Sequence, residues 1–244
     1  MVPTPHYTLD RAYYRQPTHV LNLPAGWTCP WASACLTKAD RDTGKIIVRP
    51  DRDENNATVA ELAGVDTYVC YAARSERFPS VRDMRWRNFD TMKALVWNWD
   101  EIPLPAGATH VRIHGSGDFY SQDYFDLWLD TCRANPGVTF WAFTKSLRYW
   151  VARLSEIPPN LALTASTGGK DDHLIAEHGL RTATVYYDIS DVPENMMIDL
   201  DDWEAQMPDR PSFALLENMT NRKQAEDERI RAHNERAAAQ LTAA

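Results

Sequence analysis

The chain has 244 residues, and its 34 acidic and 26 basic side chains give it a net charge of −8. Apolar residues make up 44% of it, which excludes a disordered chain and a small disulfide scaffold and fits one large domain or two small ones. No run approaches the roughly 20 apolar residues of a membrane helix, and the N-terminus lacks a secretion signal, so we expect a cytoplasmic protein with no membrane partner. The acidic balance argues against nucleic acid as a partner, because phosphate binding favours a basic face.

The first elements expected along the chain are a strand at 19–23 and a helix at 84–99. Apolar side chains in that helix recur at helical spacing, among them Trp86 and Phe89. A short apolar run follows the first strand at 67–70 and ends in a cysteine. From residue 109 onward, strands alternate with helices, and the strands are expected at 109–114, 138–143, 161–165, 182–187 and 212–216.

The helices between these strands carry signals of their own. The first of them places Tyr124, Trp128 and Cys132 on one apolar line. Ser146 is expected to cap a helix at 147–156, because a hydroxyl before the first turn can accept a backbone N–H. A third helix is expected to be capped by one of two neighbouring aspartates and closed by a glycine, namely Asp171 or Asp172 and Gly179.

Strands that alternate with helices predict an α/β fold with a parallel sheet. About six strands are too few for an eight-unit barrel, so we expect a partial (β/α)6 TIM-like barrel, with a doubly wound parallel sheet as the alternative. One domain is expected over residues 1–217, followed by a charged helical tail over 218–244. Alternation along the strand at 109–114 places His114 on the same face as Arg112.

Polar residues follow three successive strands of the expected sheet. Ser116, Gly117 and Asp118 end the first, Lys145 follows the second, and Ser166 ends the third. Each loop alone is explained by turn and capping preferences. Because the carboxyl ends of parallel strands gather at one edge, the three loops together predict a site for a small anionic ligand.

The cysteines divide into a group of three and a single one. Cys29 and Cys35 lie in a loop after the first expected strand, and Cys70 precedes the first helix, so all three can meet at the edge of the polar loops. Cys132 lies on the apolar line of a helix and is expected in the core. In a reducing compartment disulfides are not expected. Three thiolates suit an iron–sulfur cluster, whereas a zinc site more often uses the spacing C-x2-C, which the chain lacks.

Five short motifs resemble those of the gene product 88 family of actinobacteriophages, and the likeness covers residues 20–217. They are Leu-Pro-Ala-Gly-Trp-Thr-Cys-Pro at 23–30, Cys-Tyr-Ala-Ala from residue 70, Ser-Gly-Asp-Phe at 116–119, Phe-Thr-Lys-Ser at 143–146 and Leu-Thr-Ala-Ser at 163–166. The resemblance implies a phage-encoded protein made in the host cytoplasm.

The order of a strand, a cysteine loop, a helix and a strand ending in a Gly-rich acidic motif is similar, more distantly, to radical S-adenosylmethionine enzymes. That resemblance implies a partial (β/α)6 barrel and a 4Fe–4S cluster held by three cysteines. It also implies that Ser116, Gly117 and Asp118 contact the methionyl group of S-adenosylmethionine. The chain departs from that family in its C-x5-C spacing with a remote Cys70, and in having Asp118 where a glutamate is commoner.

Three classes of function remain open from the sequence. A 4Fe–4S cluster with one open iron can bind S-adenosylmethionine and start radical chemistry, whereas a 3Fe–4S cluster would leave a binding or redox protein. A zinc ion held by the same cysteines would give a hydrolase or a structural site. In the third class, the metal only staples the N-terminal loops of a phage effector that binds a host protein.

Overall fold

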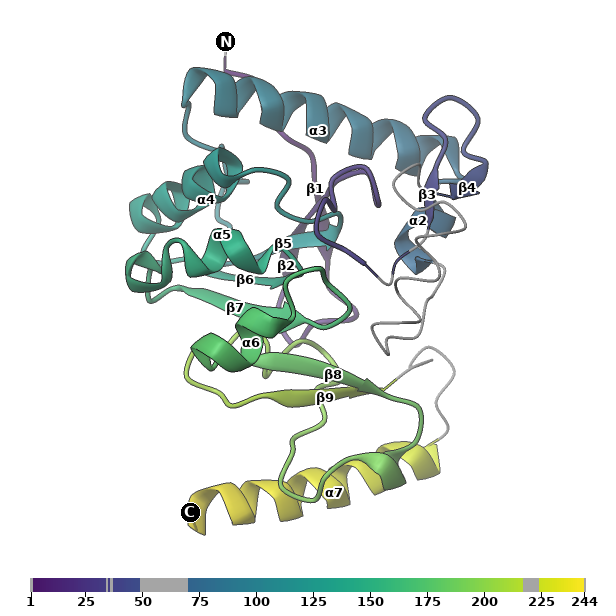
Figure 1. The fold of residues 1–244 in the computed structure, drawn as a ribbon, viewed down its shortest axis with the longest axis vertical. Coiled ribbons are helices and arrows are strands. Elements are labelled where there is room, and N and C mark those ends of the chain that lie inside the picture. The colour runs from purple at the N-terminus through teal and green to yellow at the C-terminus, as the bar shows by residue number, and fades with distance from the viewer. Residues whose placement is uncertain (1, 34, 36, 49–69, 217–223, 244) are drawn as a thin grey trace.

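The computed structural model describes residues 2–33, 35, 37–48, 70–216 and 224–243 (Figure 1). The expected boundary between residues 217 and 218, and residues 67–69 of the apolar run, lie outside the described residues. The strands are β1 (Tyr7–Asp10), β2 (Thr18–Asn22), β3 (Thr37–Ala39), β4 (Ile46–Val48), β5 (His110–Ser116), β6 (Thr139–Thr144), β7 (Leu161–Ser166), β8 (Thr182–Tyr186) and β9 (Phe213–Leu216). The α-helices are α2 (Tyr71–Ser75), α3 (Pro79–Asn98), α4 (Gln122–Ala134), α5 (Leu147–Val151), α6 (His173–His178) and α7 (Gln224–Ala243), and the 3-10 turns are η1 (Leu154–Glu156) and η2 (Ile189–Asp191).

Seven strands form one mostly parallel sheet in the order β1-β2-β5-β6-β7-β8-β9. Among the described strands of this sheet, only β1 runs antiparallel, against β2, while the other pairs are parallel. The expected α/β class with a parallel sheet is confirmed. The doubly wound alternative is wrong, because β2 and β5 to β9 follow chain order without the reversal that such a sheet contains. The sheet is open, with β1 and β9 at its edges, so it closes no barrel.

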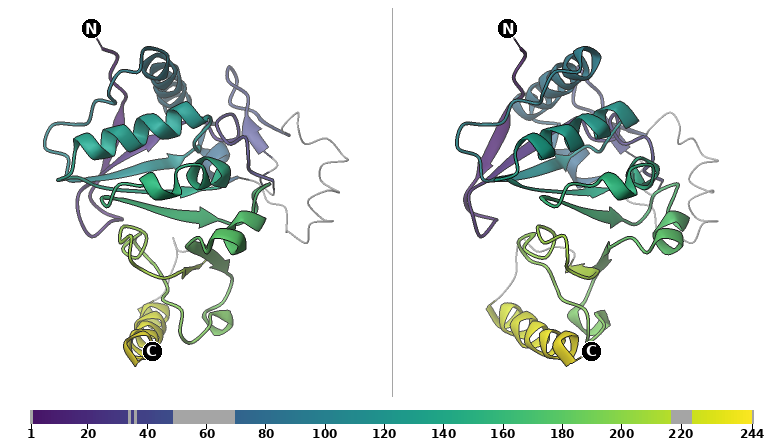
Figure 2. Two further views of the ribbon diagram at one scale, coloured as in Figure 1. Left: turned by 60° about the vertical axis from the view of Figure 1, so that its left-hand side comes forward. Right: turned by 90° about the vertical axis from the view of Figure 1, so that its left-hand side faces the viewer.

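Helices α3, α4, α5 and α6 lie along one face of the sheet (Figures 1 and 2). The main core fills the space between these helices and the sheet, and it includes the strand residues Val111, Phe140 and Leu163. Strand β6 is apolar apart from its two terminal threonines, which is typical of a strand buried on both faces. The fully buried Trp128 and Cys132 confirm that the apolar line of α4 faces this core.

The opposite face of the sheet is covered mainly by irregular segments. Trp141, Ala162 and Phe213 pack there against Tyr14 of the β1–β2 connection and Ala205 of the β8–β9 connection. Beyond β9, the long helix α7 packs through the fully buried Ile230. Of the helices that the structure describes, none combines the length and the apolar character needed to cross a membrane.

The strand β5 contains an irregularity that reverses one side chain. His114 has a φ of 67°, and the pairing of β5 with β2 shifts register between Val20 and Asn22. The ring of His114 therefore lies on the helix side, where Nε2 is 3.0 Å from the hydroxyl of Tyr124. The expectation that His114 shares the face of Arg112 is wrong, because alternation assumes a regular extended backbone.

Candidate functional site

The loop that follows β5 fits tightly against the segment that follows β2. Gly117 has a φ of +88°, and a Cβ built on it would lie 2.5 Å from Oγ1 of Thr28 and 2.7 Å from Cβ of Leu23. The hydroxyl of Ser116 donates to the carbonyl of Leu23 at 2.9 Å. Glycine is required at this position both for the backbone conformation and for the close approach. The loop thereby fixes the residue directly before Cys29.

Asp118 joins the β5 loop to the end of β6. Its buried carboxylate accepts hydrogen bonds from Oγ1 of Thr144 at 2.6 Å, from the backbone N–H of Lys145 at 2.8 Å and from that of Phe119 at 2.7 Å. Burial raises the pKa of Asp118 to about 6, although these hydrogen bonds act in the opposite direction. Both carboxylate oxygens accept hydrogen bonds from the protein, so Asp118 holds the β5 loop against the end of β6.

Lys145 brings a positive charge to the same edge. Its ammonium group donates to Oγ of Ser166, to the carbonyl of Ser166 at 3.3 Å and to that of Thr167 at 2.6 Å. Burial lowers the pKa of Lys145, while the charges of Asp118 and Asp172 raise it through space. All its hydrogen-bond partners named here are neutral oxygens. The sequence placed Lys145 and Ser166 at one site, and the structure brings them into direct contact.

The cysteine loop, which we define as residues 23–33 with Cys35, runs alongside the loop after β7. The backbone N–H and the hydroxyl of Ser33 donate to the carbonyl of Gly168 at 2.8 and 2.9 Å. The N–H of Lys170 donates to the carbonyl of Trp31 at 2.7 Å, and Ala32 and Gly169 form a β-bridge. The two loops are therefore joined like a short strand pair, which holds Cys29 and Cys35 near Lys145.

The three cysteines lie near Lys145 or near one another. The charges of Cys29 and Cys35 raise the pKa of Lys145 through space. Cys70 is the residue directly before α2, and its N–H donates to Oγ1 of Thr37, two residues beyond Cys35, at 3.0 Å. The neighbouring side chain of Cys35, followed by burial, raises the pKa of Cys70. The structure thus brings Cys29, Cys35 and Cys70 to the edge that carries the polar loops.

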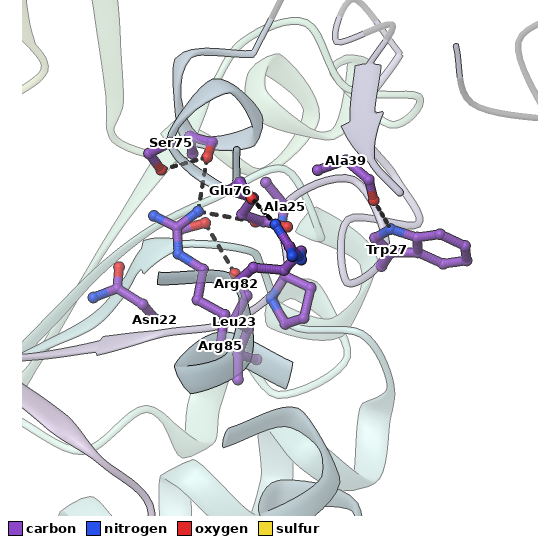
Figure 3. A network of polar contacts seen from close by, with 12 residues as sticks. Asn22, Leu23, Ala25, Trp27, Ala39, Ser75, Glu76, Arg82 and Arg85 are labelled. Carbon is purple, nitrogen blue, oxygen red and sulfur yellow. Dashed lines mark hydrogen bonds and ion pairs between the residues drawn. The ribbon is translucent and has the colours of Figure 1, made fainter. Parts of the chain in front are cut away.

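The buried ion pair between Glu76 and Arg85 contacts both the cysteine loop and α2 (Figure 3). Glu76, which directly follows α2, accepts from the N–H of Ala25 at 2.8 Å and from Arg85 of α3 at 2.9 Å. Arg85 also donates to the carbonyl of Ala72 at 2.7 Å, and Arg82 to that of Glu76 at 2.9 Å. One charged network therefore fixes the positions of the cysteine loop and of α2 relative to α3.

This network is the part of the site that sequence reasoning missed. Nothing in the sequence singles out Glu76 and Arg85, since charged side chains are rarely buried without a partner and the partner cannot be identified from the sequence. Trp31 was missed as well. The guanidinium of Arg148 lies 3.2 Å from the centre of its ring and forms two hydrogen bonds, at 2.7 and 2.8 Å, with the carboxylate of Asp171. These contacts hold the tip of the cysteine loop.

Two expected helix caps serve the site instead. The hydroxyl of Ser146 donates to the carbonyl of Phe119 at 2.7 Å, and its side chain makes no cap at α5. The carboxylate of Asp172 accepts from the N–H groups of Gly168 and Gly169 at 2.7 and 2.9 Å, and makes no cap at α6. Ser146 and Asp172 do stand at the N-cap positions of α5 and α6, and Gly179 closes α6 with a φ of 60°, as expected. Only the expected capping hydrogen bonds are wrong, because each side chain connects neighbouring loops at the sheet edge.

Cys132 stands apart from the other three cysteines. It is fully buried in α4 within the main core, as expected. Burial raises the pKa of its thiol. All four cysteines are unbridged. Among the described residues, no three His, Cys, Asp or Glu side chains lie close enough together to hold one metal ion.

Comparison with known proteins identifies a protein family and a relative of phage origin. A family model described as gene product 88 matches residues 6–239. The Gene 88 protein of Mycobacterium phage L5 is 44% identical over 52 residues, which are 21% of this chain and 22% of that protein. The match thus spans about a fifth of that relative. No solved structure matches, and the resemblance to radical S-adenosylmethionine enzymes stays a prediction. The chain belongs to the gene product 88 family.

Proposed function

We propose that this phage protein is an iron–sulfur protein whose cluster is held by Cys29, Cys35 and Cys70. The observation that carries the proposal is the meeting of the cysteine segments: the N–H of Cys70 donates to Oγ1 of Thr37, two residues beyond Cys35, and the cysteine loop is bridged to the loop that follows β7. Two segments that are far apart in the sequence thus supply soft sulfur ligands to one edge of a parallel sheet, where ligands of such folds bind.

The donor set suits a cluster better than a single ion. Each cysteine of a cluster binds a different iron, so the three sulfurs do not have to reach one point. Lys145 adds a positive charge beside these thiolates, which stabilises an anionic thiolate-ligated group electrostatically. Such a cluster supplies electrons one at a time to a ligand beside it. A 4Fe–4S form with three protein ligands leaves one iron open, and a 3Fe–4S form leaves none.

The fold supports a radical-enzyme-like arrangement in outline. Six parallel strands follow chain order and α3 to α6 lie on one face, as they would in an open (β/α)6 barrel. On this proposal the ligand is a small anion or S-adenosylmethionine, placed at the carboxyl edge of β5 to β7. Lys145 and Ser166 would bind the carboxylate of this ligand. Ser116, Gly117 and Asp118 would position the β5 loop through their contacts with Leu23, Thr28 and Thr144. The protein would act in the host cytoplasm.

Metal analysis tests the proposal. We expect about three or four irons with matching sulfide per chain, and a brown colour, in protein purified without oxygen. The Cys70→Ser variant should lose both the iron and the colour. One zinc per chain with no colour would instead support the zinc site, and a chain without metal would leave the effector that binds a host protein.

A ligand-binding measurement separates the anion site from the cluster. The Lys145→Met variant keeps the length of the side chain but removes the charge, so we expect it to bind S-adenosylmethionine at least tenfold more weakly, with binding compared at equal iron content. Arg133 forms an exposed ion pair with Asp130 at 2.7 Å on α4 and provides the control. Arg133→Met should leave binding unchanged. Equal binding by wild type and Lys145→Met would rule out the assigned role of Lys145.

A further inference from the structure

We propose that the pocket between η2 and α7 binds a small ligand through a phosphate group. The pocket has a volume of about 290 Å³, which is near the lower limit of small-molecule sites. It lies on the side of β9 where α7 packs, away from α2, the helix that Cys70 directly precedes (Figures 1 and 2). The inference goes beyond the proposed cluster and does not depend on it.

Four side chains of α7 line the pocket from one face of the helix. They are Arg229 and the residues three, four and seven positions after it, namely Ala232, His233 and Arg236. The two arginines are two turns apart, roughly 10 Å along the helix axis, so their long side chains can converge on a point between them. Ala232 lies between the arginines and fills little of that space. Helix α7 thereby offers two guanidinium groups to one ligand.

A phosphate group suits a pair of guanidinium groups. Each guanidinium presents planar N–H donors that match two oxygens of a phosphate or a carboxylate. A phosphate group carries three acceptor oxygens and up to two negative charges, whereas a carboxylate has two oxygens and one charge. Two arginines therefore favour a phosphate group over a carboxylate.

The charges around the pocket leave the arginines available to a ligand. Within the part of the chain that the structure describes, Arg236 forms no ion pair. Arg229 pairs with Asp188 across 3.8 Å, and both side chains are exposed, so this pair contributes little. Of the described carboxylates, only that of Glu194 lines the pocket. Two positive charges thus face one negative charge, and this surplus attracts an anion.

Both walls of the pocket are fixed by contacts within the chain. His233 is buried, and its Nε2 donates to the carbonyl of Met196 at 2.9 Å. The amide of Asn234 accepts from the N–H of Ile198 at 2.8 Å and donates to its carbonyl at 2.9 Å. On the other wall, Asp188 caps η2 by accepting a backbone N–H at 2.8 Å. Such a preformed pocket needs little ordering when a ligand binds.

Calorimetric titration of the metal-free full-length chain with inorganic phosphate, in about 0.15 M NaCl, tests the inference. We expect saturable binding at one site per chain, and binding of acetate about tenfold weaker or less. The Arg236→Met variant removes one charge and should weaken phosphate binding about tenfold or more. Ala232→Leu should weaken it similarly, because leucine is tolerated in a helix and fills the space between the arginines.

Arg231→Met is the matched control, because Arg231 is exposed on α7 and does not line the pocket. It should bind phosphate as the wild type does. The absence of saturable binding, equal binding of acetate, or equal losses in Arg231→Met and Arg236→Met would overturn the inference. Binding that Lys145→Met abolishes and Arg236→Met retains would overturn it too, since the phosphate would then lie at the sheet edge. The experiment contains no iron, so its result is independent of whether a cluster forms.

Discussion

Gly117 occupies a position where a single added methyl group meets two buried neighbours. A Cβ there would lie 2.5 Å from Oγ1 of Thr28, and the φ of +88° is unfavourable for other residues. Gly107 has a similar φ of +72° with no atom within 4 Å of its Cβ position, so it isolates the cost of the backbone conformation. We predict that Gly117→Ala lowers the free energy of unfolding by about 1–3 kcal/mol more than Gly107→Ala does, measured by urea denaturation.

The same substitution tests the link between the β5 loop and the cysteines. Thr28 directly precedes Cys29, so its displacement in Gly117→Ala should also reduce the iron bound per chain. Equal stability and equal iron content in the two alanine variants would show that the β5 loop does not hold the cysteine loop in place.

Asp118 makes stability depend on pH. Its pKa is raised to about 6 by burial, above the value of about 3.9 in an unfolded chain, so the folded state binds more protons between these values. Stability should therefore fall as the pH rises from about 4 to about 6, by up to about 3 kcal/mol. Urea denaturation of the metal-free chain across this range measures the slope.

A matched variant assigns that slope to Asp118. Asp118→Asn should flatten the slope, since asparagine does not titrate, although it removes one acceptor and lowers stability at every pH. Asp126 is the control, because its carboxylate pairs with Arg153 at 2.7 Å near the protein surface. An unchanged slope in Asp118→Asn would contradict the assigned pKa.

At the scale of elements, the buried ion pair between Glu76 and Arg85 determines where α2 and the cysteine loop lie. Removing one member leaves an uncompensated buried charge, so we predict that Glu76→Gln lowers the free energy of unfolding by about 3–5 kcal/mol. The exposed pair of Lys93 and Asp90 on the same helix is the control, and Asp90→Asn should cost less than about 1 kcal/mol. Thermal or urea unfolding that gives equal losses in both variants would contradict the supporting role of Glu76.

Much of the element pattern was predictable because the strands are apolar and the helices between them are amphipathic. The strands β5 to β9 lie within one or two residues of their expected positions. The strands β1, β3 and β4 and the helix α2 were not expected, since they have three to five residues each and no clear period. Helix α5 ends at Val151 and is followed by a 3-10 turn, so the expected helix at 147–156 is broken.

The site was predictable in its residue types but not in its internal contacts. Lys145 was predictable as a site residue, because a single charged side chain at the end of a buried strand needs an oppositely charged or polar partner. The orientation of His114 could not, since its φ of 67° leaves no trace in the alternation of side chains. Burial lowers the pKa of His114 to about 3, so it stays neutral in its contact with Tyr124 and serves the core.

At the scale of the whole molecule, the candidate site lies at the carboxyl ends of the parallel strands, whereas Cys132 lies in the main core. Cys29, Cys35 and Cys70 come from segments that β2, β5 and β7 hold together, whereas Cys132 packs among the residues of α4. The central claim is therefore that three cysteines act as one set and the fourth does not.

The most direct test measures iron and sulfide per chain in four serine variants, one for each cysteine, after reconstitution without oxygen. We predict that the Cys29→Ser, Cys35→Ser and Cys70→Ser variants each lose the iron and the visible absorption, while Cys132→Ser keeps both. Retention of full iron and sulfide by any of the first three variants, or their loss in Cys132→Ser, would contradict the assignment of the cluster to this edge of the sheet.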